Sequence, residues 1–293
     1  MSEGAPSRPQ AFALLSSAPA YPERLVCLTE ETTEILYRIG AGDRVVGVSG
    51  FTVRPREARK KPKVSSFLDA NFDRILELKP DLVLGFSDLQ ADLAKQLALR
   101  GVPVYLFNQR SIGEILQTVR VVGALVGRAA ASEALARELE AGLERHALAA
   151  AALPRHPKVF FEEWHQPLIS GIRWCSELIE LVGGVDICAE SRLHQEAKGR
   201  IYQPEEIARR NPEVVIASWC GRKASREKIR AREGWQTVSA VQDDQLYEVK
   251  SSYILQPGPA ALSDGVDQLA RIISAVARGE KLDPPRLGDL RQA

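Results

Sequence analysis

Large aromatic side chains recur just after the predicted strands of this sequence, although only 6% of its residues are aromatic. The carboxyl ends of parallel strands are a usual place for ligands, so we expect these side chains to line a cleft. A flat, partly apolar ligand would stack against such walls. The candidate ligand-binding residues of this kind are Phe51, Phe67, Phe86, Trp164, Trp174, Trp219 and Tyr253, with Leu68 next to Phe67.

Two further side chains, His165 and Cys220, could reach a metal ion that the ligand carries. Each follows a predicted strand in the second half of the chain, where side chains would point into the cleft. A neutral imidazole and a thiolate are both good ligands for transition metals. His165 does not lie in a spacing suited to a metal site of the protein itself, and the cysteines form no CxxC pair. We therefore expect no intrinsic cofactor, and a metal contact by His165 only through the ligand.

The sequence lacks the common motifs of catalysis, so we do not expect an enzyme. It contains no G-x-S-x-G, no G-x-x-x-x-G-K-[ST] and no G-x-G-x-x-G. The alternative from that class is a subunit of the nitrogenase-like or chelatase type, in which Cys175, Cys188 and Cys220 would matter. The spacing of these cysteines matches no cluster motif. The basic run at 54–63 is either a solvated loop or a contact for carboxylate or phosphate groups at the cleft mouth.

The elements that must position these residues occur twice in the same order. The segments 73–86 (DRILELKPDLVLGF) and 205–218 (EEIARRNPEVVIAS) each predict a short helix, a turn at proline and a buried parallel strand. The segments 33–45 and 176–187 share a second pattern of helix, glycine and strand. Between the halves, residues 129–153 are strong helix formers and predict one helix ~35–40 Å long. The predicted fold is therefore α/β, with two Rossmann-like lobes joined by one long α-helix and a ligand cleft between them.

The predicted organisation has five parts. They are a loose N-terminal arm at 1–24, an N-terminal α/β lobe at 25–126, a connecting helix at 127–156, a C-terminal α/β lobe at 157–278 and a C-terminal tail at 279–293. The net charge of +1 gives no electrostatic case for nucleic acid as a partner. No apolar run approaches the ~18–20 residues that span a bilayer. The first residues show neither the basic start nor the long apolar stretch of a signal peptide, so the chain as written predicts no export signal.

Three segments carry a resemblance to a known family: RLVCLTEETTEILYRIGAGDRVVGVS at 24–49, NFDRILELKPDLVLGF at 71–86 and SELIELVGGVDI at 176–187. They resemble successive parts of the periplasmic substrate-binding proteins of ABC importers that carry cobalamin or iron siderophores, the group with a single helical backbone. The similarity runs from about Arg24 to about Arg278 and looks closest to the cobalamin-binding branch. It implies that a monomer binds cobalamin or a related corrinoid between its lobes in the periplasm and delivers it to an ABC permease.

The resemblance also implies roles for particular residues. Phe67, Phe51 and Tyr253 match positions that contact the corrin, and Asp73 matches the N-lobe acid that docks to arginines of the permease. The matching C-lobe position falls near Leu255, in an apolar stretch that lacks a carboxylate.

Iron-siderophore, haem and corrinoid binders share these motifs, so haem or a ferric siderophore is the alternative ligand. Tyr253, Tyr202 and His165 would suit haem, and the basic run at 54–63 would suit a siderophore. Because the second docking acid and the export signal are missing, the alternative function is a cytoplasmic corrinoid-binding or sensor protein without a permease.

Overall fold

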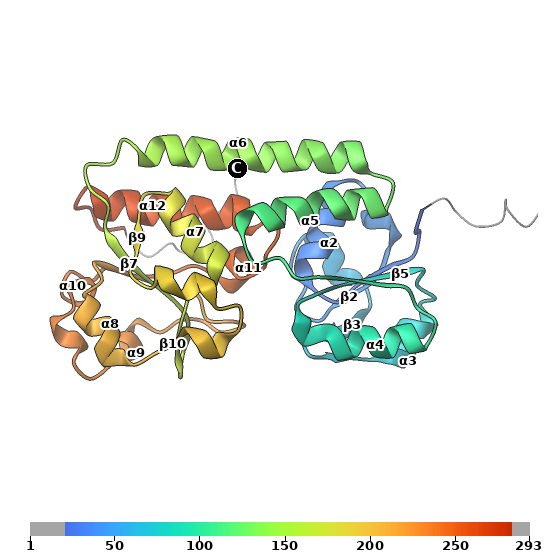
Figure 1. The fold of residues 1–293 in the computed structure, drawn as a ribbon, viewed down its shortest axis with the longest axis horizontal. Coiled ribbons are helices and arrows are strands. Elements are labelled where there is room, and N and C mark those ends of the chain that lie inside the picture. The colour runs from blue at the N-terminus through green and yellow to red at the C-terminus, as the bar shows by residue number, and fades with distance from the viewer. Residues whose placement is uncertain (1–20, 283–293) are drawn as a thin grey trace, which may run out of the picture.

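The structure is a computed structural model that describes residues 21–282. Two separate sheets form two lobes, which lie side by side beneath one long helix (Figure 1). The predicted two-lobed α/β fold is therefore confirmed. Most of the predicted arm at 1–24 and of the predicted tail at 279–293 lies outside the described residues.

The sheet of the N-terminal lobe has the strand order β4–β3–β2–β1–β5–β6. Neighbouring strands are parallel except β3 and β4, which form a tight antiparallel turn. The strands are β1 (Leu25–Cys27), β2 (Val45–Ser49), β3 (Lys63–Ser66), β4 (Asp69–Ala70), β5 (Leu82–Phe86) and β6 (Val104–Phe107). The helices between them are α2 (Glu30–Arg38), α3 (Phe72–Glu77) and α4 (Ala91–Leu99), with short 3-10 turns η1 (Gly42–Arg44), η2 (Arg56–Lys60) and η3 (Asp88–Gln90).

The sheet of the C-terminal lobe has the order β10–β8–β7–β11–β12, and β9 pairs with the start of β7. Strands β7, β9, β11 and β12 run parallel, whereas β8 returns antiparallel as a hairpin. The strands are β7 (Lys158–His165), β8 (Leu168–Ser170), β9 (Val185–Asp186), β10 (Ile201–Tyr202), β11 (Val214–Ala217) and β12 (Leu246–Glu248). The α-helices are α7 (Arg173–Leu181), α8 (Pro204–Arg210), α9 (Arg226–Arg230), α10 (Ser239–Gln242), α11 (Ser251–Ile254) and α12 (Val266–Ala277). Among them lie the 3-10 turns η4 (Ala189–Leu193), η5 (Ala197–Arg200) and η6 (Trp235–Thr237) and the π-helix η7 (Ala261–Gly265).

The duplicated sequence segments correspond to duplicated structure. In the N-lobe, α2 leads to β2 and α3 leads to β5; in the C-lobe, α7 leads to β9 and α8 leads to β11. The strand order β2–β1–β5–β6 of the first sheet matches β9–β7–β11–β12 of the second. Local start signals for the helices set these repeats. Asn71 caps α3 by accepting the Arg74 N–H at 2.9 Å, and Pro204 begins α8.

Each sheet is covered on both faces, as parallel sheets generally are. Alternate residues of β1 divide between two cores: Leu25 and Cys27 face the main core, and Val26 faces a smaller one. Strand β7 behaves in the same way, since Phe161 belongs to the main core and Phe160 to a second small cluster. The main core runs beneath the helices of both lobes, so the two lobes share apolar packing.

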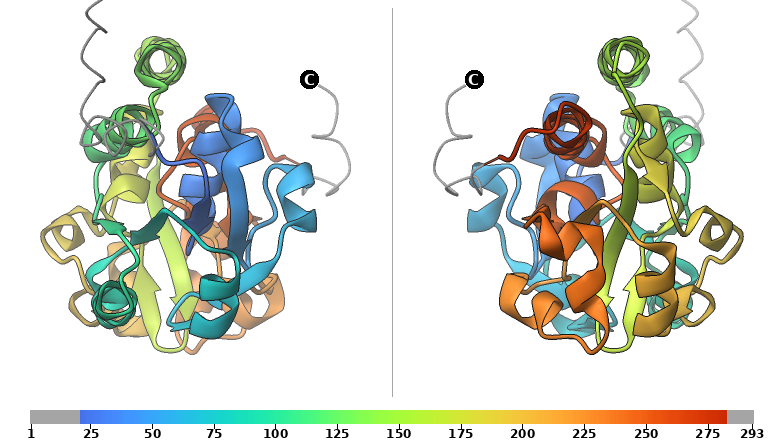
Figure 2. Two further views of the ribbon diagram at one scale, coloured as in Figure 1. Left: turned by 90° about the vertical axis from the view of Figure 1, so that its right-hand side faces the viewer. Right: turned by 90° about the vertical axis from the view of Figure 1, so that its left-hand side faces the viewer.

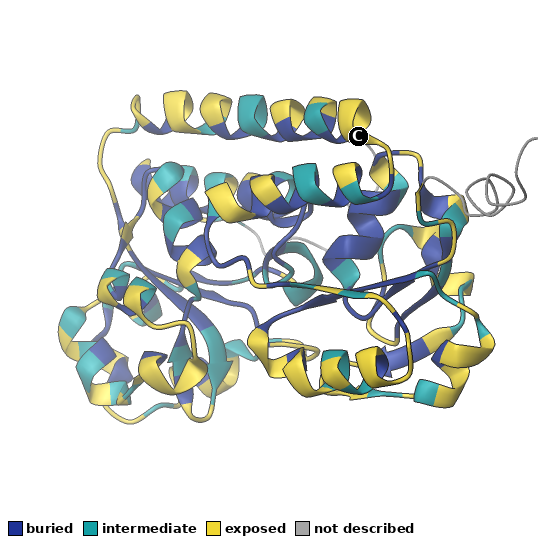
Figure 3. Cartoon of the chain, turned by 45° about the vertical axis from the view of Figure 1, so that its right-hand side comes forward, coloured by how far each residue is buried: buried dark blue, intermediate teal, exposed yellow. Residues whose placement is uncertain are grey.

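The long helix α6 (Ala129–Ala150) joins the lobes, and it lies within the predicted range. It packs on α5 (Ile112–Leu125), α7, α12 and the π-helix. Figures 1 and 2 show it running over the top of the molecule, and Figure 3 shows that its outer face is exposed and its inner face buried. Helix α5 begins at a capping box, in which Ser111 and Glu114 bond each other's backbone N–H groups. The two helices, packed on each other, bridge the lobes.

Candidate functional site

Apolar side chains gather on the N-lobe where strands end. Phe51 (53% exposed) follows β2, Leu68 (60%) lies in the β3–β4 turn, and Leu89 (60%) follows β5. The side-chain amide of Gln90 donates to the Phe67 carbonyl at 2.7 Å and thereby ties the loop after β5 to the β3–β4 turn. Exposed large apolar side chains that gather in one place commonly mark a ligand-binding surface. Leu89 was not predicted, because it precedes a helix rather than continuing an aromatic pattern.

Phe86 lies at the end of β5 and is covered rather than open. The Arg110 guanidinium lies 4.8 Å from the centre of its ring, and only 7% of Phe86 is exposed. Arg110 donates to the Ser87 hydroxyl at 3.1 Å and to Asp88 at 3.0 Å. Ser87 has φ 80°, a backbone conformation that L-residues rarely adopt and that is typical of functional sites. The surface at this point is therefore presented by Arg110 and Asp88, with Phe86 as its support.

An aromatic group forms the corresponding edge of the C-lobe. The His165 ring stacks on Trp219 with 4.2 Å between ring centres, and Trp164 lies 5.1 Å from His165. Trp219 is only 2% exposed, and its indole N–H donates to Glu162 at 2.9 Å. The Glu162 carboxylate is fully buried and accepts two bonds from Arg232, at 2.7 and 2.6 Å. Trp219 thus supports His165 from below, and it does not itself face the cleft.

His165 has the chemistry of a neutral imidazole. Desolvation lowers its pKa, and the positive charges of Lys228, Arg232 and Arg222 add to that effect. Its Nδ1 is buried and has no hydrogen-bond partner among residues 21–282, so Nε2 is the ring nitrogen left for a ligand. A neutral imidazole with one accessible nitrogen can bind a transition metal.

Cys220 is at the surface beside the cleft. Desolvation raises the pKa of its thiol, and the negative charges of Glu163 and Glu30 raise it further. Because the thiol stays protonated at neutral pH, Cys220 is a poorer metal ligand than His165.

A polar recess lies where residues of the two lobes meet. This small recess of about 10 Å³, room for about one water molecule, is lined by Glu30, Glu34, Val53, Arg54, Ser252 and Gln256. Arg54 bonds Glu34 at 3.3 Å and Asp264 at 2.6 Å, and it lies 5.2 Å from the centre of the Tyr253 ring. Tyr253 therefore lies at the junction, with the Arg54 guanidinium over its ring.

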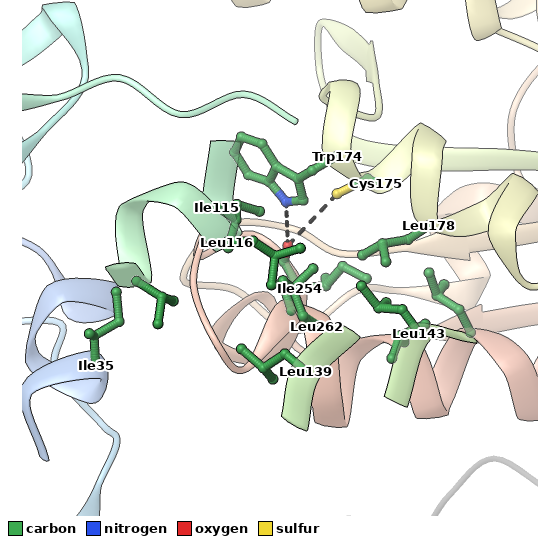
Figure 4. Close-up of a cluster of buried hydrophobic side chains, with 14 of the residues drawn as sticks. Ile35, Ile115, Leu116, Leu139, Leu143, Trp174, Cys175, Leu178, Ile254 and Leu262 are labelled. Carbon is green, nitrogen blue, oxygen red and sulfur yellow. Dashed lines mark hydrogen bonds between the residues drawn. The ribbon is translucent and has the colours of Figure 1, made fainter. Parts of the chain in front are cut away.

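The expectation that Trp174 lines the cleft is wrong. Trp174 lies on the buried face of α7, is 2% exposed and belongs to the main core. Its indole N–H donates to the Ile254 carbonyl at 2.8 Å (Figure 4). The helical spacing of Trp174 with Leu178 places it on the apolar stripe of the helix. Its role is to fasten α7 to α11.

Two exposed acids occupy equivalent places on the two lobes. Asp73 is exposed on α3, and Glu205 is exposed on α8, the duplicate of α3. Sequence reasoning looked for the second acid near Leu255, which is partly buried against the main core. The signal for Glu205 was already present in the paired segments 73–86 and 205–218.

Other parts of the described chain contribute little to a site. A larger open hollow of about 530 Å³ lies at the N-lobe edge between α4 and β6, and residues such as Ala94, Ala98 and Pro103 line it without an aromatic side chain. Within residues 21–282, no three His, Cys, Asp or Glu side chains come together to hold a metal ion. None of the helices in that range is both long and apolar enough to cross a bilayer.

Comparison with known proteins agrees with this architecture. The family model described as periplasmic binding protein matches residues 25–253. An uncharacterized ABC transporter substrate-binding lipoprotein of Bacillus subtilis is 28% identical over 262 residues, which cover 86% of this chain and 80% of that protein.

Two solved structures share the fold. The crystal structure of a periplasmic vitamin B12-binding protein of Vibrio cholerae has a TM-score of 0.71 and 25% identity, and it covers 88% of this chain and 99% of its own. A periplasmic heme-binding protein from Roseiflexus sp. RS-1, in apo form, has a TM-score of 0.74 at 22% identity and covers 86% of this chain and 99% of its own. At that identity the second likeness concerns the fold alone.

Proposed function

The chain belongs to the periplasmic binding protein family, whose members bind substrates for ABC import, and we propose that its ligand is cobalamin or a related corrinoid. The ligand would lie between the lobes, and the protein would hand it to a permease outside the cytoplasmic membrane. No step of this function is catalytic.

The proposal rests on two surfaces, one on each lobe, that present apolar and aromatic side chains. Phe51, Leu68 and Leu89 present an exposed apolar surface on the N-lobe. Trp164 and His165 present aromatic edges on the C-lobe. A corrin ring is large, flat and largely apolar, so it gains stacking from both sides. The likeness to a vitamin B12-binding protein supports the same ligand class.

Haem is the second candidate, and His165 is the residue that favours it. A neutral imidazole is a common axial ligand of haem iron. The tyrosines are less suitable, because Arg54 lies over the Tyr253 ring and the Tyr202 hydroxyl is engaged with Ser191 and Glu190. In either case the metal arrives with the ligand.

Delivery to a permease would use Asp73 and Glu205. Each is exposed on the equivalent helix of its lobe. Neither forms an ion pair within the described residues, so both carboxylates are open to arginines of a partner. A two-lobed protein with one acid on each lobe can contact both halves of a transporter at once.

Ligand titration tests the proposal most directly. Cyanocobalamin and haemin are each added to the purified protein while tryptophan fluorescence is recorded. Saturable quenching by cyanocobalamin that is tighter than quenching by haemin is the expected result. Tighter binding of haemin, or no saturation with cyanocobalamin, would overturn the corrinoid assignment.

The visible spectrum tests the role of His165. If Nε2 displaces water from cobalt, the bands of aquocobalamin shift on binding to the wild-type protein and not on binding to His165→Ala. Equal shifts for the two proteins would show that His165 is not the ligand, and Cys220→Ser would then be examined. Quenching of fluorescence by both proteins serves as the control that each still binds.

A further inference from the structure

The first five residues of α2 include three acids, Glu30, Glu31 and Glu34, which lie against the C-lobe. Gln256 donates its side-chain amide to Glu30 at 3.2 Å, and the Ala260 N–H donates to Glu34 at 3.2 Å. Glu31 lies between them, and Gly258 packs so closely on it that an added Cβ would lie 2.5 Å from the Cβ of Glu31. The acids of one lobe therefore form a direct contact with segment 256–260 of the other.

Glu31 and Glu34 are buried, and Glu31 is incompletely bonded. Glu31 is 1% exposed and Glu34 is 7% exposed. One oxygen of Glu31 accepts the Thr29 hydroxyl at 2.5 Å, and the other, Oε2, has no partner among the residues that the structure describes. A buried carboxylate without enough donors is costly when ionised and much less so when protonated.

Positive charge at this contact is scarce. Among residues 21–282, the cation in direct contact is Arg54, which bonds both Glu34 and Asp264. Lys63 acts on Glu30, and Arg38 acts on Glu34, through the electric field rather than through a bond.

The other titratable neighbours do not supply a cation. Tyr253 lies beneath Arg54. The negative charges of Glu31 and Glu30 raise the pKa values of the Cys27 and Cys220 thiols respectively, so both thiols are neutral. With all four acids ionised, the contact would carry four negative charges against one bonded cation.

We infer that Glu30 and Glu31, beside the ion pairs of Arg54 with Glu34 and Asp264, form a proton-linked clasp between the lobes. When Glu30 and Glu31 are protonated, segment 256–264 packs tightly on α2. When they ionise, desolvation and mutual repulsion loosen that contact and the lobes separate more readily. The recess between the lobes is lined by Glu30, Glu34 and Arg54, so loosening this contact should also weaken the binding of a ligand held between the lobes. The effect on ligand release rests on the proposed function, whereas the clasp itself does not.

The direction of the titration follows from burial. Desolvation raises the pKa of Glu30 to about 7 and that of Glu31 to about 8, and it raises the pKa of Glu34 as well. The clasp is therefore closed at mildly acidic pH and opens as the pH rises through 7–8.

Hydrogen exchange of the ligand-free protein tests the clasp. Amide protection of segment 256–264 is measured at pH 6 and pH 8, after correction for the intrinsic pH dependence of exchange. We expect protection to fall about tenfold in the wild type, the equivalent of one pKa unit. Glu31→Gln keeps the shape of a protonated acid and should remove most of this fall. Equal protection of the wild type at both pH values would overturn the inference.

Two further variants make the test specific. Glu30 is more exposed than Glu31, so Glu30→Gln is the variant to measure if Glu31→Gln does not fold. Glu30→Gln should also reduce the pH dependence of protection. Glu144→Gln removes an exposed carboxyl on α6 and should keep the wild-type behaviour. A loss of pH dependence in Glu144→Gln would overturn the assignment to the clasp.

Binding of cyanocobalamin at the two pH values tests the link to function. The dissociation constant should be about tenfold higher at pH 8 than at pH 6 in the wild type, and nearly constant in Glu31→Gln. If exchange changes and the dissociation constant does not, the link between the clasp and release is wrong. If cyanocobalamin binds at neither pH, the proposed ligand is wrong, and hydrogen exchange still decides the question of the clasp.

Discussion

Phe51 shows what a single exposed side chain contributes to the cleft. Because it is 53% exposed and has little to support, Phe51→Ala should change the free energy of unfolding by less than about 0.5 kcal/mol. It should raise the dissociation constant of cyanocobalamin roughly fivefold to tenfold, since stacking contributes about 1 kcal/mol. Leu99→Ala, on a 72% exposed residue of α4, is the control and should bind normally. Unchanged affinity in Phe51→Ala would remove Phe51 from the site.

Arg232 shows what a single buried charge contributes to stability. Arg232→Ala would leave the fully buried Glu162 with Trp219 as its remaining side-chain donor. Breaking a buried ion pair from one side costs about 3–5 kcal/mol, so the urea midpoint should fall strongly. Arg137→Ala breaks an exposed pair with Glu133, which solvent screens, and should change the urea midpoint little. Similar losses in the two variants would mean that Glu162 is not held as described.

The residues that sequence reasoning missed are those set by distant partners. Arg54 lies in the basic run at 54–63, which suggests a solvated loop, yet its partner Asp264 is 210 positions away. Glu30 and Glu31 occupy a first helical turn, where acids are usually exposed and favoured by the helix dipole. Their burial depends on segment 256–260, which no local pattern connects to α2. The prediction for Trp174 was wrong for a related reason. It assumed that Trp174 lies in a loop, whereas helix α7 already begins at Arg173.

Helices α5 and α6 provide a matched test at the level of elements. At Gly123 of α5 a Cβ would collide with the side chain of Ser132 on α6, whereas at Gly113 of the same helix it would meet nothing within 4 Å. Gly123→Ala should therefore reduce the free energy of unfolding by about 1–3 kcal/mol. Gly113→Ala should stabilise by up to about 1 kcal/mol, because alanine favours the helix. The measurement is urea denaturation, and equal effects at the two sites would contradict the packing.

The elements themselves were largely predictable, because their start and stop signals are local. The helix predicted over 129–153 occupies Ala129–Ala150, and the paired segments became α3–β5 and α8–β11. The hairpin of β7 and β8 was not anticipated, although it carries His165 at its turn. Nothing in the composition of β7 distinguishes a strand that continues into a hairpin from one that ends in a loop.

The pH dependence of stability belongs to the whole molecule, because it reports the contact between the lobes. The pKa values of Glu30 and Glu31 are about 7 and 8 in the folded protein, above the ordinary value of 4.5. The folded state therefore holds more protons than the unfolded state between pH 4.5 and 8, and its stability falls as the pH rises. His165, whose pKa is lowered, acts in the opposite direction but is only half-buried.

We expect the free energy of unfolding, measured with urea, to be about 1–2 kcal/mol lower at pH 8 than at pH 5.5. One pKa unit corresponds to about 1.4 kcal/mol, so this is less than the full effect of the two raised pKa values. Glu31→Gln should flatten this dependence and be the more stable protein at pH 8. Stability that rises from pH 5.5 to pH 8 would contradict the raised pKa values.

The single passage of the chain between the lobes has a practical consequence. After α6 the chain enters the C-lobe through residues 151–157, most of which are exposed. Each side of this loop contains one complete sheet, and α6 keeps its contacts with α7, α12 and the π-helix. A polypeptide cut here would consist of two fragments that reassociate through buried surfaces, with an affinity that depends on their concentration. Attached to the halves of a split reporter, these fragments would turn ligand binding into a signal of reassembly.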